Sequence, residues 1–206
     1  MSLAQRMSLA VAALSFAAAG AFAQPYSTLN PPQPTEGGGK VEVIEFFWYG
    51  CPHCYTLEPS VVTWSKKVPA DVVFKRVPAV PSDAWADAAR MFYTLEAMGK
   101  LEEYHQKVFD AIHKSNVNMN NKKIRDDWLA KNGLDPIKFA EVEKSFSVAT
   151  KVNRAKQLTY AYKVDSVPRV AVNGKYFTTA EQAGSVDKVF QIVDQLIGMA
   201  RKEKAS

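Results

Sequence analysis

Cysteine is scarce in this sequence, because Cys51 and Cys54 are the only two among 206 residues. One close-spaced pair excludes a disulfide framework of the kind that holds small extracellular domains together. A bridge between the two would enclose too few residues to remove much entropy from the unfolded chain. The pair is therefore better explained by its reactivity than by any contribution to stability.

Blocks of like charge are also missing. The formal net charge is +5, but Lys and Arg are interleaved with Glu and Asp, and no basic stripe alternates with aromatic residues. This pattern indicates a solvated, mildly basic surface and excludes nucleic acid as the expected partner. The hydrophobic fraction of 47% is ample for a core, and the length suits one domain, or one domain with an insertion.

Long apolar runs are absent except near the N-terminus, where residues 7–22 are uncharged and rich in Ala, Leu and Val. That run is shorter than the roughly 20 residues that cross a bilayer, which argues against a membrane anchor. Arg6 precedes it, and Ala21 and Ala23 supply the small residues that a signal peptidase reads. We expect residues 1–23 to be a secretory signal peptide cleaved after Ala23.

Proline and glycine are concentrated in residues 24–40, which include Pro25, Pro31, Pro32, Pro34 and Gly37 to Gly39. Such a composition does not hold a helix. It predicts an extended leader that packs little apolar surface.

The remaining chain alternates strand and helix patterns. The expected elements are a strand at 41–47, a helix from Cys51, a strand at 71–77, five helical segments, strands at 169–172 and 175–177, and a final helix. A strand-helix-strand order predicts a parallel pair with a crossover helix. Asn173-Gly174 predicts a tight hairpin between the last two strands.

The helical segments between 83 and 163 have apolar faces at helical spacing. We expect a small helical bundle in which the fourth face consists of Phe139, Val142 and Phe146. His105 and His113 fall in this region, and we expect both on the surface or partly packed.

The two cysteines lie where the first strand meets its helix. Pro52 suits the first helical turn, where its missing N–H would be unpaired anyway. Cys51 should therefore lie at the helix N-terminus, where free backbone N–H groups and the helix dipole favour a negative sulfur. Protonated His53 would stabilise the same thiolate. Cys54 lies one turn further on the same side, less exposed and less easily ionised.

A stabilised Cys51 thiolate favours the reduced protein, so that the disulfide is oxidising and Cys51 is a good leaving group. We expect the pair to be donated to substrate thiols. A metal-carrying binding protein is the alternative from another class. Cys51, Cys54 and His53 supply only three ligands, whereas structural zinc sites use four. We therefore expect no metal and no cofactor. Covalent haem attachment needs His where Tyr55 stands.

Residues 46–55, with the order Phe-Phe-Trp-Tyr-Gly-Cys-Pro-His-Cys-Tyr, resemble the active-site segment of the DsbA family of periplasmic thiol:disulfide oxidoreductases. Val167-Pro168, ahead of a strand, is similar to the proline loop of that family. The resemblance implies an α/β thioredoxin fold with an inserted helical domain. The thioredoxin-like part would comprise residues 41–82 and 164–201, and the insertion residues 83–163. Trp48-Tyr49-Gly50 departs from the more uniformly aromatic lead-in of the best-known members.

The resemblance also implies roles for individual residues. Val167–Pro168 would be a cis peptide bond facing the sulfurs, and the Val167 backbone would bind an extended substrate strand. Glu45 would be a buried acid beneath the pair that relays a proton to or from Cys54. Its alternative is an outward-facing strand residue. Glu58 and Lys75 resemble a second charged pair near the site.

The implied activity is that of a dithiol oxidase in the periplasm. It would form a mixed disulfide on Cys51 with unfolded exported proteins that carry free thiols. A membrane partner resembling DsbB would reoxidise it, and we expect a monomer. A disulfide isomerase or reductase on the same fold is the alternative. Isomerases of this compartment add a dimerisation domain, for which the leader is too short.

Overall fold

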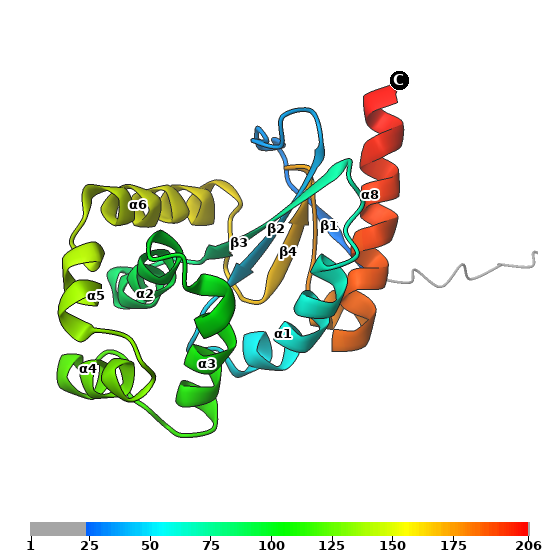
Figure 1. The fold of residues 1–206 in the computed structure, drawn as a ribbon. Helices are drawn as coiled ribbons and strands as arrows, with labels where there is room; N and C mark the ends of the chain where they lie inside the picture. The colour runs from blue at the N-terminus through cyan, green and yellow to red at the C-terminus, as the bar shows by residue number, and fades with distance from the viewer. Residues whose placement is uncertain (1–23, 206) are drawn as a thin grey trace, which may run out of the picture.

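A five-stranded mixed sheet with strand order β1-β5-β4-β2-β3 forms the centre of the computed structural model (Figure 1). The structure describes residues 24–205, so the predicted signal peptide at 1–23 lies outside the described residues. The strands are β1 (Ser27–Thr28), β2 (Val41–Phe47), β3 (Val72–Pro78), β4 (Arg169–Val172) and β5 (Tyr176–Thr178). The helices are α1 (Pro52–Ser65), α2 (Ala86–Ala97), α3 (Leu101–His113), α4 (Lys122–Lys131), α5 (Pro136–Glu143), α6 (Phe146–Ala161), α7 (Ala180–Ala183) and α8 (Val189–Ala205). Short 3-10 turns, η1 (Asp83–Trp85) and η2 (Val186–Lys188), precede α2 and α8.

The predicted strand-helix-strand unit is confirmed. β2 pairs in parallel with β3 from Val41 opposite Val72, and α1 makes the connection. β4 then adds antiparallel to β2, and β5 antiparallel to β4, through the Asn173-Gly174 turn. All seven residues of β2 are buried, because helices cover both faces of the sheet. This is an α/β thioredoxin-like fold.

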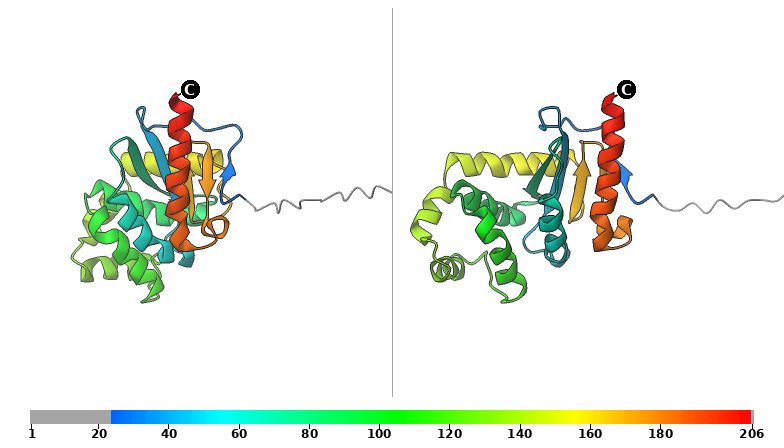
Figure 2. Two further views of the ribbon diagram at one scale, coloured as in Figure 1. Left: turned by 90° about the vertical axis from the view of Figure 1, so that its right-hand side faces the viewer. Right: turned by 45° about the vertical axis from the view of Figure 1, so that its right-hand side comes forward.

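The two faces of the sheet have different cores. Val41 and Val43 pack with residues of α1 and α8 on one face, whereas Ile44 and Phe46 pack towards the helices between β3 and β4. Figure 2 shows α8 along one side of the sheet and α2 to α6 gathered beyond the other. Because side chains alternate along a strand, Glu45 belongs to the face that α1 covers.

One predicted apolar face in the helical region is wrong. Phe139 is buried, but α5 ends at Glu143 and Phe146 is 86% exposed as the first residue of α6. The Ser145 side chain accepts a hydrogen bond from the Val148 backbone N–H and so begins a new helix. This N-cap separates two elements that the apolar spacing had joined.

The leader packs more closely than its composition predicted. β1 pairs antiparallel with β5 and extends the sheet, and Leu29 is buried. The Thr178 hydroxyl donates to the Pro25 carbonyl at 2.7 Å, and the Gln33 N–H donates to the Gly174 carbonyl at 2.8 Å. The expectation failed because two paired residues suffice to continue a sheet, and no two-residue strand has a readable pattern.

Gly174→Ala is expected to destabilise the protein more than Gly99→Ala. Both glycines have φ of +67°, which an alanine adopts only with strain. A Cβ on Gly174 would lie 2.0 Å from the Gln33 carbonyl oxygen, whereas none of the described atoms lies within 4 Å of a Cβ on Gly99. We expect Gly99→Ala to cost about 1 kcal/mol and Gly174→Ala about 2 to 3 kcal/mol. Denaturant unfolding of the two variants measures the difference, and equal losses would show that the leader is not held against the hairpin.

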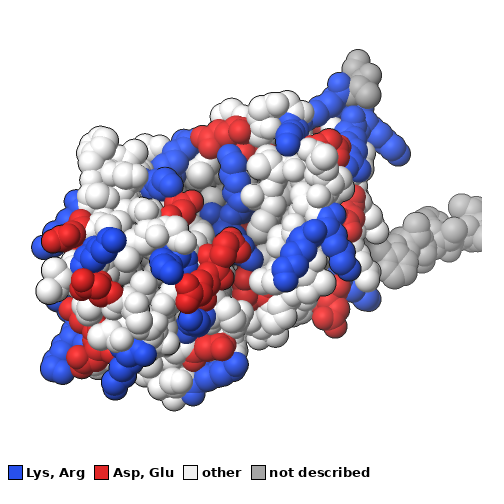
Figure 3. Space-filling view, viewed as in Figure 1, with Lys and Arg blue, Asp and Glu red and all other residues white. Residues whose placement is uncertain are grey.

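Basic and acidic side chains are interspersed over the face drawn in Figure 3, as the sequence indicated. Among residues 24–205, none of the helices combines the length and apolar character needed to cross a membrane.

Candidate active site

The turn from β2 into α1 sets the geometry of the two cysteines. The Cys51 N–H donates to the Trp48 carbonyl at 3.0 Å, and Cys51 itself has the extended backbone of an N-cap. Pro52 is the first residue of the helix, as predicted. Cys51 is 8% exposed and Cys54 is fully buried, while Pro52 and His53 are exposed. The sulfurs are free thiols in this structure, and an attacking group reaches Cys51 first.

The surroundings of Cys51 lower the pKa of its thiol from 9.0 to about 6. The largest cause is a hydrogen bond from the Cys54 thiol, followed by the backbone N–H groups of Cys54 and His53. The charge of His53 contributes least, and burial opposes the shift. The helix N-terminus therefore acts as predicted, but the partner cysteine contributes more than the histidine.

Cys54 has the opposite environment. Burial raises the pKa of its thiol far above the usual range, and the hydrogen bond to Cys51 and the nearby charge of Glu45 raise it further. At neutral pH the pair therefore consists of one thiolate and one thiol. Such asymmetry makes Cys51 the better leaving group and gives Cys54 a proton to lose before it can react.

The loop before β4 faces the sulfurs. Val167–Pro168 is a cis peptide bond, as the resemblance implied. The Cys51 sulfur lies 3.4 Å from the Val167 carbonyl oxygen, to which it donates when it is protonated, although 116 residues separate the two in sequence. The fold thus brings the backbone of Val167 beside the reactive sulfur.

Glu45 is buried, with 1% of its surface exposed, so the outward-facing alternative is wrong. Its Oε2 lies 3.5 Å from Nε of Arg76 and makes no hydrogen bond with the described residues. Burial raises the pKa of the Glu45 carboxyl to about 8, and the charge of Glu58 adds to the effect while Arg76 opposes it. A carboxyl with this pKa exchanges protons readily near neutral pH.

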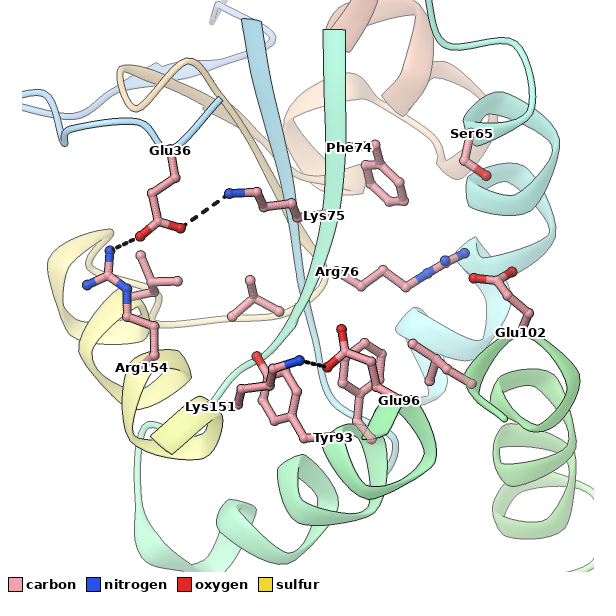
Figure 4. Close-up of a pocket in the computed structure, with 14 residues that line it drawn as sticks. Glu36, Ser65, Phe74, Lys75, Arg76, Tyr93, Glu96, Glu102, Lys151 and Arg154 are labelled. Atoms are coloured by element: carbon pink, nitrogen blue, oxygen red, sulfur yellow. Dashed lines mark hydrogen bonds and ion pairs between the residues drawn. The ribbon is translucent and has the colours of Figure 1, made fainter. Parts of the chain in front are cut away.

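The expected pairing of Glu58 with Lys75 is not found. Glu58 binds Arg76 at 2.8 Å, whereas Lys75 binds Glu42 at 2.8 Å and Glu36 at 3.3 Å. Figure 4 shows the reason. Neighbouring side chains of β3 point in opposite directions along a cavity of about 510 Å³, so that Lys75 points towards Glu36 and Arg76 points away from Glu36. Arg76 is therefore the cation beneath the cysteines, and sequence reasoning missed it.

Two histidines also lie closer to the site than the sequence suggested. His105 is 5% exposed rather than partly packed, and the Tyr49 hydroxyl lies 2.7 Å from its Nδ1. His113 is partly buried, and its Nε2 lies 2.8 Å from the Tyr49 carbonyl oxygen. The signal for His105 was its spacing, since it lies four residues from both Leu101 and Phe109 on the predicted apolar face of α3.

Gly50 explains the unusual lead-in to the motif. A Cβ at this position would come within 2.5 Å of the Trp48 ring. Glycine lets the indole of Trp48 fold back over the chain and stack on Trp85, with ring centres 4.2 Å apart. The surface beside Cys51 is therefore built partly from η1.

Within the described residues, no group of three or more His, Cys, Asp and Glu side chains is placed to hold a metal ion.

The chain is similar to known proteins in both sequence and fold. Residues 67–196 match the family model of the DSBA-like thioredoxin domain. The thiol:disulfide interchange protein DsbA of Pseudomonas aeruginosa is 42% identical over 181 residues, which cover 88% of this chain and 84% of that protein. The protein of the same name in Bordetella parapertussis is 43% identical over 181 residues, which cover 87% of this chain and 86% of that protein. The crystal structure of Pseudomonas aeruginosa DsbA superimposes with a TM-score of 0.84 at 41% identity, covering 89% of this chain and 95% of that one.

Proposed function

Because the chain belongs to the DSBA-like thioredoxin family and is a thiol:disulfide oxidoreductase, we propose that it acts as a dithiol oxidase that donates a Cys51–Cys54 disulfide. The observation that carries this direction is the contrast between the two thiols. The pKa of Cys51 is about 6, whereas that of Cys54 is raised far above its usual range. A stabilised Cys51 thiolate favours the reduced enzyme and hence the transfer of its disulfide to a substrate.

The proposed reaction has two exchanges. A substrate thiolate attacks the Cys51 sulfur, the Cys51–Cys54 bond breaks, and Cys54 leaves and takes a proton from Glu45. A second substrate thiolate then attacks the substrate sulfur of the mixed disulfide, so that Cys51 leaves as a thiolate and the substrate becomes bridged. The substrate has lost two electrons, and the enzyme dithiol has gained them.

The remaining residues of the proposal fit around these steps. The Val167 carbonyl beside Cys51 would pair with an extended substrate backbone, next to Pro168. The charge of exposed His53 would help to stabilise the Cys51 thiolate, and Pro52 would keep the first helical turn in place. We propose residues 83–163 as the insertion that frames this surface and residues 41–82 and 164–201 as the thioredoxin-like part.

The proposed substrates are unfolded exported proteins with free thiols in the periplasm, and the proposed reoxidant is a membrane protein resembling DsbB. Export rests on the signal pattern of residues 1–23. We propose a monomer as the working form.

Equilibration with reduced and oxidised glutathione tests the oxidase proposal. We expect the enzyme disulfide to be reduced by a small fraction of reduced glutathione, because the Cys51 thiolate stabilises the product. The fraction reduced is followed by alkylation of free thiols after acid quenching. If the Cys51–Cys54 disulfide instead persists in excess reduced glutathione, its reduction potential is low and the protein is a reductase.

A further inference from the structure

His105 is a buried titratable residue that the proposed exchange steps do not use. It lies on α3 between the Tyr49 hydroxyl, 2.7 Å from Nδ1, and the Glu58 carboxylate, whose Oε2 is 3.5 Å from Nε2. The rings of Phe47, Phe92 and Phe109 surround the imidazole edge to face or tilted, so that it has little freedom to turn.

The two polar neighbours of His105 select the same tautomer. Burial raises the pKa of the Tyr49 phenol well above the usual range, and the charge of Glu58 adds to the effect while Arg76 opposes it, so the O–H stays a donor. A donor at Nδ1 requires that Nε2 carry the imidazole proton. The Nε2–H then points at the carboxylate oxygen of Glu58, which is an acceptor.

Glu58 connects this histidine to the acid beneath the cysteines. Its other oxygen binds Arg76 at 2.8 Å, and Nε of Arg76 lies 3.5 Å from Glu45. Within the described residues, Glu45 Oε2, Arg76 Nε and His105 Nε2 are all buried without a hydrogen bond of ordinary length. Three buried polar atoms without a hydrogen bond, all in one connected set of contacts, indicate a network that is not fully satisfied. Small movements of these side chains can therefore change which of them are hydrogen-bonded.

The same group meets the surface through a cavity of about 720 Å³ between α1 and α3. Glu58, Arg76 and His105 line it, and its rim includes the exposed side chains of Thr56 and Gln106. The cavity therefore exposes the contacts among Glu58, Arg76 and His105 to solvent, whereas Glu45 is not part of its lining.

We propose that His105 is a positioning residue: fixed by the Tyr49 hydroxyl, it holds the Glu58 carboxylate against Arg76 and so controls the proton exchange between Glu45 and Cys54. The inference rests on the proposed role of Glu45 as the proton partner of Cys54. It assigns no covalent step to His105 itself.

The direction of the effect follows from the charges that face the group. The charged groups are Glu58 on α1, Arg76 on β3 and Glu102 on α3 itself, and the neutral Tyr49 phenol faces the ring from the segment after β2. Burial is the largest influence on His105 and lowers the pKa of its imidazole, so the ring is a neutral donor at pH 7. Without that donor the charge of Glu58 is less compensated, and the Glu45 carboxylate becomes harder to form.

The test is the pH dependence of disulfide ring closure in a single protein. Cys51 is first joined to glutathione. Cys54 then gives its proton to Glu45 and attacks the Cys51 sulfur, the Cys51–Cys54 bond forms, and glutathione leaves as a thiolate. The rate should rise with pH around the Glu45 pKa of about 8. In His105→Leu, which removes the Nε2–H donor, the midpoint should move up by about half a pH unit, which slows closure at pH 7 about threefold.

Companion variants keep the result interpretable. Tyr49→Phe should shift the midpoint in the same direction by less, because it removes only the fixing hydroxyl. Tyr104→Phe is the matched control. It removes a tyrosine hydroxyl that lies on α3 and donates to the Asn132 carbonyl, so it should leave the midpoint unchanged. The Cys51 pKa, measured from thiolate absorbance, should stay within about 0.3 units in every variant.

Histidine ¹⁵N resonances of the unmodified protein add a readout that needs no variant, and should show neutral His105 protonated at Nε2 at pH 7. A wild-type pH profile in His105→Leu, or a neutral ring protonated at Nδ1, overturns the inference. If Glu45→Gln leaves the profile unchanged, the role of Glu45 fails and the inference with it. An ordinary Cys51 pKa in the wild type would instead count against the oxidase proposal.

Discussion

Cys51→Ser is expected to abolish disulfide donation, with a loss of at least about a thousandfold in the rate of substrate oxidation. A hydroxyl can neither form the disulfide nor accept a substrate thiolate. Cys54 cannot replace it, because its sulfur is fully buried and burial keeps it protonated. The measurement is oxidation of a reduced two-cysteine peptide by equal amounts of each variant. Substantial activity in Cys51→Ser would reverse the assigned roles.

Cys54 variants separate trapping from thiolate stabilisation. With Cys51 preloaded as a mixed disulfide with thionitrobenzoate, Cys54→Ala and Cys54→Ser should both exchange the dye for a client that carries a single thiol. They should then hold the client, since neither Cys54 nor a second client thiol is present to release it. They should differ in the pKa of Cys51. The Cys54 side chain is the largest cause that lowers this pKa, so alanine should raise it by about one unit or more. Serine keeps a hydroxyl donor and should raise it less.

A Cys51 pKa in Cys54→Ala that equals the wild-type value would show that the backbone N–H groups, rather than the Cys54 thiol, stabilise the thiolate. Mass spectrometry of the trapped adducts checks which sulfur holds the client. Adducts found on the peptide containing Cys51 are the expected result.

Between about pH 6 and pH 9, the reduced protein should gain stability over the oxidised protein as the pH rises. The folded pKa of Cys51 is about 6, against an ordinary value of 9.0. In this window the unfolded dithiol binds a proton that the folded protein has released, so the free energy of unfolding increases with pH. The contribution is lost as the pH falls through 6. One proton limits the slope to about 1.4 kcal/mol per pH unit, and solvent screening reduces it.

The difference between the two redox forms is the quantity to measure, because other groups titrate in the same window. Glu45 has a raised pKa of about 8, so it opposes stability increasingly as the pH rises towards that value. This effect is present in both redox forms and largely cancels in the difference. Guanidinium unfolding of oxidised and reduced protein at several pH values gives the curve, with Cys51→Ser, which lacks the thiolate, as control. A stability difference that does not change between pH 6 and pH 9 would contradict the low pKa.

The sequence predicted most of the framework because each part of it has a local cause. β-branched and aromatic residues predicted β2, Pro52 predicted the helix start, and Asn173-Gly174 predicted the hairpin, all of which the structure contains. The cysteine spacing with Val167-Pro168 pointed to the correct family. The sequence predictions were wrong where the local signal was weak, as at β1, or where a helix N-cap outweighed the apolar spacing, as at Ser145.

The charged partners beneath the cysteines could not be read from the chain. Glu58 is 18 residues from Arg76 and its contact with His105 comes from another helix, so neither leaves a pattern in local spacing. Lys75 and Arg76 are adjacent cations, and only the alternation of β3 against α1 and α6 decides which one faces Glu58.

The sequence by itself determined the reactive pair, its place at a helix N-terminus and the expectation of a low Cys51 pKa, because those depend on residues next to one another. The resemblance, rather than any local pattern, implied that Val167 faces the sulfurs. Tertiary structure alone decided that the Cys54 thiol is the largest influence on the Cys51 thiolate, and that Arg76 and His105 enclose Glu58 near Glu45. Burial and the direction of a side chain depend on what packs against it, and distant segments of the chain supply that packing.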